Sequence, residues 1–361
     1  MPRAGTPRGT DTMKAMVLPA LGAPLRLETV PVPAIGPTDV LLRVRAAGVG
    51  LTVVIMTAVP GRVTSFPRIP GHEVAGEVAA VGAEVGHVRV GDRVTCHFYL
   101  TCGACRFCRS GRETLCTAFR GYVGMASDGA YAEYMAVPAA NVTPIPEGVS
   151  DLEAAVAADA ICTPYHACRE EARVGPGDTV LIVGAGGGVG IHGVQMARLC
   201  GGFVLAADIT DDKLAAAREC GADALVDARH GDLAAQVRKL TDGRGVDAAI
   251  DFVASRETLE GSLAALARGG RLVIIGSRPP AVFGVDAAFT VDPGRMLYDM
   301  LEIHGSRYVT LAEIQQTLGL LQQRRIRAVV SRTFPLEGAE EAHALLRQNA
   351  LVGRAALVLE G

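Results

Sequence analysis

The sequence has 361 residues, of which 49% are hydrophobic and 20% charged, and its formal net charge is −3. The length favours two domains, because single hydrophobic cores rarely grow beyond about 250–300 residues. The weak negative charge argues against a nucleic-acid or anionic-membrane surface, which would need a basic stripe, and no apolar run reaches the roughly 18 residues of a membrane span.

Residues 13–158 are expected to form a β-rich domain. Short β-forming runs alternate with glycine and proline turns, as in VLLRV (40–44), EVAAV (77–81) and RVTCH (93–97). This pattern predicts a partly closed β-barrel. Near residues 150–173 the periodicity becomes helical, and Ser150 with Glu153 three residues later has the spacing of a capping box.

From residue 178 onward the sequence alternates between strand-like and helix-like segments. The expected strands include TVLIVG (179–184), FVLAA (203–207), DAAIDF (247–252), RLVIIG (271–276) and LEIHGS (301–306), with helices at 188–200 and 211–220. Such alternation implies βαβ units and a doubly wound parallel sheet. Two helical stretches and a last strand, RAALVLE (354–360), follow.

The segment VGAGGGVG (183–190) lies between an expected strand and an expected helix. In that context, glycines let backbone N–H groups approach a pyrophosphate at the helix N-terminus. The fingerprint reads Ala185-x-Gly187-x-x-Gly190, one glycine short of the strict pattern. Asp208, at the end of the next strand, can accept hydrogen bonds from the adenosine ribose and disfavours a 2′-phosphate. The candidate dinucleotide-binding residues of this turn are Gly186, Gly187, Gly188, Val189 and Gly190.

Four of the nine cysteines are clustered in CGACRFCRSGRETLC. Cys102, Cys105, Cys108 and Cys116 have the spacing C-x2-C-x2-C-x7-C, which suits a closed, structural tetrahedral Zn²⁺ site. An iron–sulfur cluster is the alternative, because C-x2-C-x2-C also occurs in cluster proteins. The cysteine cluster and the lack of an apolar leader lead us to expect a cytoplasmic protein.

A third motif, PGHEVAGEV (70–78), contains His72, a potential metal ligand, and Glu73, which can bind or orient a metal. In sequence order, this motif, VGDRV (90–94), the cysteine segment and the glycine-rich turn resemble the medium-chain dehydrogenase/reductase superfamily, in particular its zinc-dependent alcohol dehydrogenases. The resemblance implies an α/β protein: a GroES-like β-rich catalytic domain (13–158, with the zinc lobe at about 102–116) that the chain re-enters at 305–361, and a Rossmann domain (159–304).

The resemblance also assigns roles to individual residues. It implies NAD(H) as cofactor, with Lys213 joining Asp208 at the ribose and Arg354 approaching the cofactor. Phe98 would form a wall of the substrate pocket, and the Thr52 hydroxyl would begin a proton relay. The expected partners are a small-molecule substrate and further copies of the chain, in a homodimer or homotetramer; neither nucleic acid nor a membrane is expected.

One part of the family pattern is missing. In AGVGLTV (47–53), Gly50 stands where the family has a cysteine ligand of the catalytic zinc, and Asp159 aligns with the third ligand. His72 and Asp159, with Glu73 nearby, would form at most a weak second zinc site, because a catalytic zinc normally has three protein ligands. In the family site, zinc polarises the substrate oxygen.

Three functions follow from this pattern. The first is hydride transfer between nicotinamide and a small alcohol, aldehyde or ketone. The second is zinc-independent reduction of an activated C=C bond, as in an enone or acryloyl thioester. The third is a non-catalytic NAD-binding protein.

Overall fold

The chain forms two structural units, and the first is built from segments that precede and follow most of the second. The computed structural model describes residues 11–284, 287–307 and 309–359. The first unit comprises the chain up to Asp159, Thr310–Ala350 and the segment from Arg354 onward, and the second comprises Ala160–Val309 and Leu351–Gly353. Among the described residues, no helix combines the length and apolarity needed to cross a membrane.

The boundaries between the units differ from the expected ones. The sequence predicts them at 158/159 and 304/305, whereas the structure has them at 159/160 and 309/310. The second boundary is later because the chain remains hydrogen-bonded to the sheet of the second unit after the last strand of that sheet. The backbone N–H of Ser306 donates to the carbonyl of Ile274 at 3.0 Å.

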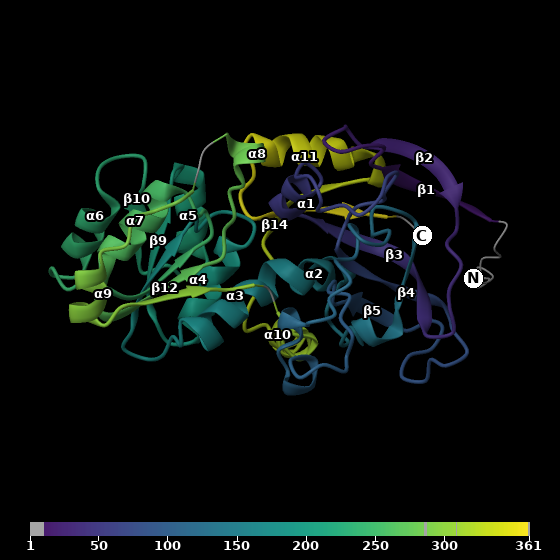
Figure 1. Cartoon of the computed structure of the whole chain (residues 1–361), viewed down its shortest axis with the longest axis horizontal. Helices are drawn as coiled ribbons and strands as arrows, with labels where there is room; N and C mark the ends of the chain where they lie inside the picture. Colours follow the sequence, from purple (N-terminus) through teal and green to yellow (C-terminus); the bar gives the residue numbers. More distant parts are fainter. Residues whose placement is uncertain (1–10, 285–286, 308, 360–361) are drawn as a thin grey trace. The chain divides into compact units, whose positions relative to one another are not determined.

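The first unit is built on strands, as the sequence predicts. They are β1 (Thr12–Val17), β2 (Arg26–Pro31), β3 (Asp39–Val49), β4 (Glu73–Val81), β5 (Arg93–Cys96), β6 (Tyr134–Pro138), β7 (Val142–Pro144), β14 (Val330–Phe334) and β15 (Arg354–Val358). β1 and β2 form a hairpin (Figure 1). The others form a seven-stranded sheet in the order β14-β15-β3-β4-β5-β7, with β6 also paired to β3.

β3 is the strand that organises the site. It lies between β15 and β4 and is antiparallel to both. The register pairs Ala355 of β15 with Val49, and Glu73 of β4 with Gly48. The end of β3 is therefore flanked by the start of each neighbouring strand. The helices of this unit are α1 (Leu51–Met56), α2 (Asp151–Val156), α10 (Leu311–Gln322) and α11 (Ala339–Arg347).

The helical segment predicted at 150–173 is present but is not a uniform α-helix. After α2 come a π-helical stretch at Ala157–Ile161, α3 (Cys162–His166) and a second π-helical stretch at Ala167–Glu171. The capping box is confirmed: the Glu153 N–H donates to Ser150 Oγ at 3.2 Å, and the Ser150 N–H donates to the Glu153 carboxylate at 2.9 Å. Asp159 lies in the first π-helical stretch, a conformation that is frequent at functional sites.

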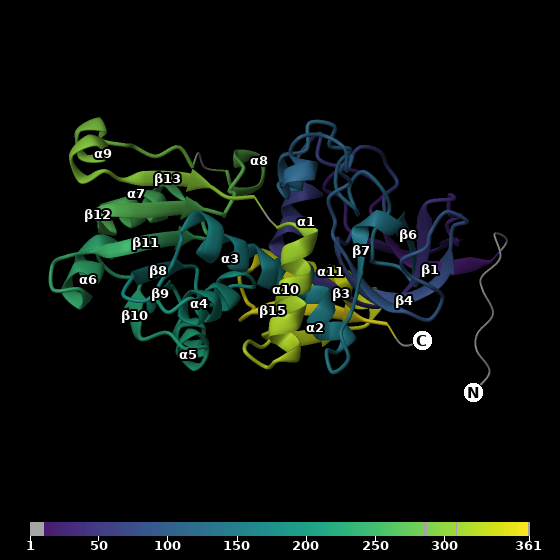
Figure 2. The same cartoon turned by 90° about the horizontal axis from the view of Figure 1, so that it is seen from below.

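The second unit contains a six-stranded sheet whose strand pairs are all parallel, which confirms the predicted Rossmann architecture. Its order is β10-β9-β8-β11-β12-β13 (Figure 2). The strands are β8 (Thr179–Val183), β9 (Phe203–Asp208), β10 (Ala224–Asp227), β11 (Val246–Asp251), β12 (Leu266–Ile274) and β13 (Glu302–Gly305). The helices are α4 (Gly190–Leu199), α5 (Asp211–Glu219), α6 (Leu233–Leu240), α7 (Arg256–Ala265), α8 (Pro280–Phe283) and α9 (Pro293–Asp299).

The central strands of this sheet are apolar because both of their faces are covered. Leu181, Leu205, Ala249 and Leu272 are fully buried in one core cluster. Helix α4 begins two residues later than predicted, at Gly190, because residues 184–189 form the turn that leads into it. The carboxyl ends of β8 and β9 thus present this turn and Asp208 at the same edge of the sheet.

Candidate active site

The glycine-rich turn after β8 is closely packed against its own backbone. Gly184 has a φ of +77°, the left-handed conformation that glycine favours. Ala185 does not have a positive φ, so its position does not require glycine. The N–H groups of Gly184 and Ala185 both donate to the carbonyl of Ala207 in β9. A Cβ on Gly190 would collide with the carbonyl oxygen of Gly184. This packing explains how the turn forms although the strict fingerprint lacks its first glycine.

Asp208 is fixed beside the turn. Its Oδ2 accepts the Gly186 N–H at 2.8 Å and its Oδ1 accepts the Ile209 N–H at 2.7 Å. Lys213 of α5 is also buried, and a Cβ on Gly186 would meet its side chain. Burial lowers the pKa of Lys213, and the charge of Asp208 acts in the opposite direction. The structure therefore brings Asp208, Lys213 and Gly186 together.

His192 of α4 was not singled out by the sequence, yet it supports the same turn. Its Nδ1 lies 3.0 Å from the carbonyl oxygen of Gly188, and because a carbonyl only accepts, Nδ1 carries the proton. Burial lowers the pKa of His192 to about 4, so the imidazole is neutral at pH 7. A histidine inside a helix gives no signal of this role in the sequence.

The four clustered cysteines converge in the first unit. Their Sγ atoms all lie within 4.8 Å of one another, with Cys102–Cys108 at 3.9 Å and both Cys105–Cys108 and Cys102–Cys116 at 3.5 Å. Four sulfurs around a tetrahedral zinc, with Zn–S of about 2.3 Å, would be separated by about 3.8 Å. Backbone N–H groups, first that of Cys108 and then that of Thr117, lower the pKa of Cys105 to about 5, which favours its thiolate. The residues fit a tetrahedral metal ion.

A second polar cluster consists of His72, Glu73 and Asp159, all buried. One ligand atom from each lies within 4.8 Å of the others, and His72 Nε2 is 3.3 Å from Asp159 Oδ2. Phe98 places its ring edge-on to His72, with ring centroids 4.6 Å apart. Thr52 lies half-buried in the first turn of α1, directly after Gly50 and Leu51.

Arg354 shares this cluster, whereas the family resemblance assigns it to the cofactor. Its Nε donates to Glu73 Oε2 at 3.3 Å, one of its terminal nitrogens pairs with Glu73 Oε1, and the same nitrogen donates to Asp159 Oδ2 at 3.4 Å. Burial lowers the pKa of Arg354 to about 9, so the guanidinium stays charged at pH 7.

The same guanidinium decides whether this cluster suits a zinc ion. A Cβ on Gly50 would collide with the terminal guanidinium atoms of Arg354. The position of the expected cysteine ligand is thus both empty of a donor and filled by a cation. The cluster also has a single imidazole, and Glu73 Oε2 and Asp159 Oδ2 already accept from Arg354, so this arrangement does not fit a catalytic zinc.

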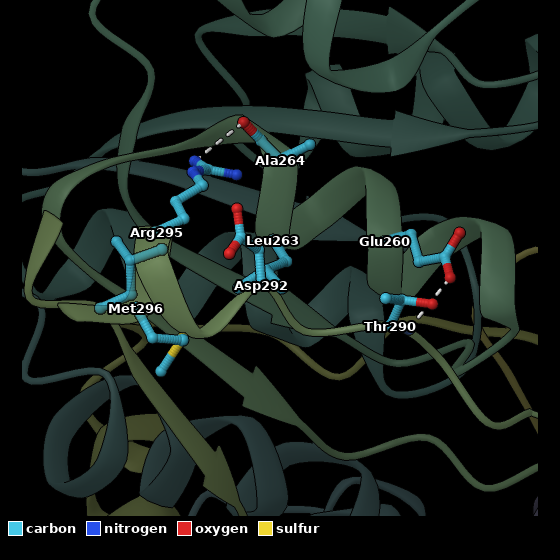
Figure 3. Close-up of a pocket in the computed structure, with 8 residues that line it drawn as sticks. Glu260, Leu263, Ala264, Thr290, Asp292, Arg295 and Met296 are labelled. Carbon is cyan, nitrogen blue, oxygen red and sulfur yellow. Dashed lines mark hydrogen bonds between the residues drawn. The ribbon is translucent and has the colours of Figure 1, made fainter. Parts of the chain in front are cut away.

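A separate hollow of about 250 Å³ lies between α7 and α9 in the second unit. It contains none of the predicted site residues. In Figure 3, the Arg295 guanidinium donates a hydrogen bond to the carbonyl of Ala264, and the Thr290 N–H donates one to the Glu260 carboxylate. Because α9 directly precedes β13, the hollow lies near the amino ends of the strands, away from the edge that carries the glycine-rich turn. We therefore do not assign it to the active site.

Comparisons with known proteins agree with this architecture. Residues 36–147 match the family model described as the alcohol dehydrogenase GroES-like domain, and residues 188–323 match that of the zinc-binding dehydrogenase. An NAD-dependent alcohol dehydrogenase of Sulfurisphaera tokodaii is 33% identical, over 96% of this chain and 100% of its own length. An L-threonine 3-dehydrogenase of Chelativorans is 35% identical, over 82% of this chain and 84% of its own length.

A solved structure, described as the crystal structure of AibC, superposes with a TM-score of 0.88 at 36% identity and covers 97% of this chain and 96% of its own. The two family models cover most of the chain, and relatives above 30% identity span nearly all of it. The chain therefore belongs to the medium-chain dehydrogenase/reductase superfamily, in the branch of the zinc-binding alcohol dehydrogenases.

Proposed function

We propose that the protein is an NAD(H)-dependent oxidoreductase that transfers hydride between the cofactor and a small alcohol, aldehyde or ketone. The observation that carries this proposal is the tightly packed glycine-rich turn with Asp208 fixed beside it. Bound nicotinamide would supply or accept the hydride. The backbone N–H groups of Gly188, Val189 and Gly190 would hold the pyrophosphate, and Asp208 and Lys213 the adenosine ribose. Gly186 and Gly187 would shape the turn, because their N–H groups donate to Asp208 and to the Gly184 carbonyl.

At the substrate end, the proposal relies on the polar residues of the first unit. Thr52 offers a hydroxyl that can donate to, or accept from, a substrate oxygen, and His72 offers an imidazole for proton transfer. Phe98, against His72, would form an apolar wall. The relatives named above are named for different substrates, so membership of the family does not identify the alcohol.

A second candidate function is reduction of an activated C=C bond without a metal. Arg354 in the polar cluster favours it, because an enone or acryloyl thioester spreads the developing charge over its own carbonyl and needs less help from a Lewis acid. NADH oxidation with matched panels of saturated ketones and enones distinguishes the two candidates. Turnover of neither class, with NADH bound, would contradict both and leave a non-catalytic NAD-binding protein.

We expect a preference for NADH over NADPH. Both Asp208 oxygens accept backbone N–H groups, which fixes a negative charge at the ribose end, and the next two residues, Ile209 and Thr210, offer no cation to a 2′-phosphate. The kcat/KM ratio should favour NADH by at least about tenfold, or roughly 1.4 kcal/mol.

Two variants test the source of this preference. Asp208→Ser should abolish most of it, whereas Asp211→Ser, which removes a nearby carboxylate that is 82% exposed, should retain it. Equal kcat/KM values for the two cofactors in the unmodified protein would contradict the assignment of Asp208.

We further propose that the cysteine cluster holds a structural zinc. The positions of the Sγ atoms support it: three of their separations are 3.5–3.9 Å, and all four atoms lie within 4.8 Å of one another. Because four thiolates fill a tetrahedral shell, no position remains for a substrate, so the ion would stabilise the lobe without entering the reaction. No disulfide joins cysteines in the described part of the chain, and we propose a cytoplasmic location, where thiols stay reduced.

We also propose that the chain forms a homodimer or homotetramer, with a small molecule as its other partner. In the described part of the chain, β13 has a paired neighbour on one side only, and exposed apolar residues stand just before it. Leu297, Tyr298 and Met300 are 70%, 81% and 77% exposed. Light scattering should give at least twice the chain mass of 37.5 kDa, and Tyr298→Glu should lower it. A monomeric unmodified protein would refute the proposal.

A further inference from the structure

We propose that Arg354 is the resident cation of the cluster formed by His72, Glu73 and Asp159, where it takes the place of a metal ion. In this assignment Gly48 and Gly50 are the residues that make room for it. The protein would then carry one zinc, at the four cysteines, and none at this cluster. The inference concerns metal content and holds for any substrate of the proposed reaction.

The strand register places the two partners on either side of β3. Because Ala355 is opposite Val49, Arg354 lies beside Gly50, while Glu73 is opposite Gly48 on the other neighbour. Strands in a sheet are about 4.8 Å apart, so the backbones of Arg354 and Glu73 are separated by about twice that distance. Their side chains can meet only by crossing the face of β3.

The crossing requires that β3 carry no side chain there. Residues 48 and 50 share one face, because successive side chains of a strand alternate. A Cβ on Gly48 would lie 2.8 Å from the Glu73 Cβ and 2.7 Å from its carboxyl carbon. Gly50 has φ −126° and ψ 161°, an extended conformation open to any residue, so backbone geometry does not require glycine there. Glycine is required there because the guanidinium of Arg354 occupies the space that a side chain would need.

The charges in the cluster are also matched to an internal cation. Arg354 contacts Glu73 through two nitrogens and Asp159 through one of them, and Asp159 in turn lies 3.3 Å from His72. A divalent ion placed among the same ligand atoms would lie against a buried positive charge, and it would compete with Arg354 for Glu73 Oε2 and Asp159 Oδ2. Buried like charges at such distances repel strongly.

Metal content tests the assignment directly. Native mass spectrometry and elemental analysis of the full-length protein, purified with zinc present, should find about one zinc per chain. Cys105→Ser should lower this value, whereas His72→Gln should leave it unchanged. A content of about two zinc ions per chain, with one lost in His72→Gln, would overturn the proposal. This comparison does not depend on a variant of Arg354 that folds.

The converse experiment removes the internal cation. Dialysis against Co²⁺ followed by visible absorption reports tetrahedral cobalt, and elemental analysis gives its amount. The double variant Gly50→Cys/Arg354→Gln should gain a second cobalt per chain, because it restores a thiolate and frees both carboxylates. Gly50→Cys alone should not, since the guanidinium occupies the same space.

A matched control removes an arginine elsewhere in the same sheet. Arg332 of β14 is 50% exposed and pairs with Glu341, so Arg332→Gln should keep the metal content of the unmodified protein. Two results would overturn the proposal: a second cobalt in Gly50→Cys with Arg354 intact, or a folded double variant that still takes only one.

Discussion

Replacing Arg354 by methionine should lower the free energy of unfolding by about 3–5 kcal/mol, the cost typical of removing one partner from a buried ion pair. The change leaves Glu73 and Asp159 buried, with no cation between them. Their carboxylates would then repel each other in a medium where water screens little. Urea denaturation followed by circular dichroism measures the loss.

The control for this prediction is Arg332→Met. It removes an ion pair whose two side chains are 50% and 58% exposed, and such surface pairs contribute only about 0–1 kcal/mol. A loss of less than about 1 kcal/mol in Arg354→Met as well would mean that the guanidinium does not neutralise the buried cluster.

Replacing Gly190 by alanine should damage both the stability and the cofactor affinity of the protein. The added Cβ would collide with the Gly184 carbonyl oxygen, stand 2.9 Å from its carbon and 3.2 Å from the Ala185 Cα. These are backbone atoms that cannot rotate away, and overpacking of this kind costs about 1–3 kcal/mol. We expect NADH affinity to fall by more than about tenfold, since the turn would no longer hold its N–H groups in place.

Gly187→Ala separates the two effects. Its Cβ would lie 3.3 Å from the Gly184 carbonyl oxygen, a contact that a small shift relieves, so unfolding should occur at nearly the same urea concentration as in the unmodified protein. NADH affinity should still fall, because this glycine allows the backbone to approach the pyrophosphate. Fluorescence titration with NADH measures the affinity. Full NADH affinity in Gly190→Ala would contradict the placement of the cofactor at this turn.

Local patterns in the sequence predict most of the second unit. Apolar runs locate its central strands, because those strands are buried on both faces. In the first unit, the capping box at Ser150 and Glu153 depends on residues only three positions apart. The cysteine cluster is equally local, with ligands within fifteen residues of Cys102. In each case the contact is determined by short-range geometry, and the sequence displays it.

The surroundings of Arg354 could not be predicted in this way. Its contact with Glu73 joins residues 281 positions apart and depends on the register of three strands. The loss of a ligand at Gly50 is visible in the sequence, but the side chain that fills the space is not. His192 is similar, because its bond to Gly188 depends on how α4 packs onto the turn.

The bare face of β3 has a consequence for how this chain can diverge. Any side chain at residue 50 excludes the guanidinium seated there, and once that guanidinium is seated, a cysteine at residue 50 has no space. We therefore expect the effects of mutations at positions 50 and 354 to depend strongly on each other. In evolutionary terms, we expect a return to a thiolate at residue 50 to require a second change that moves the guanidinium away from it.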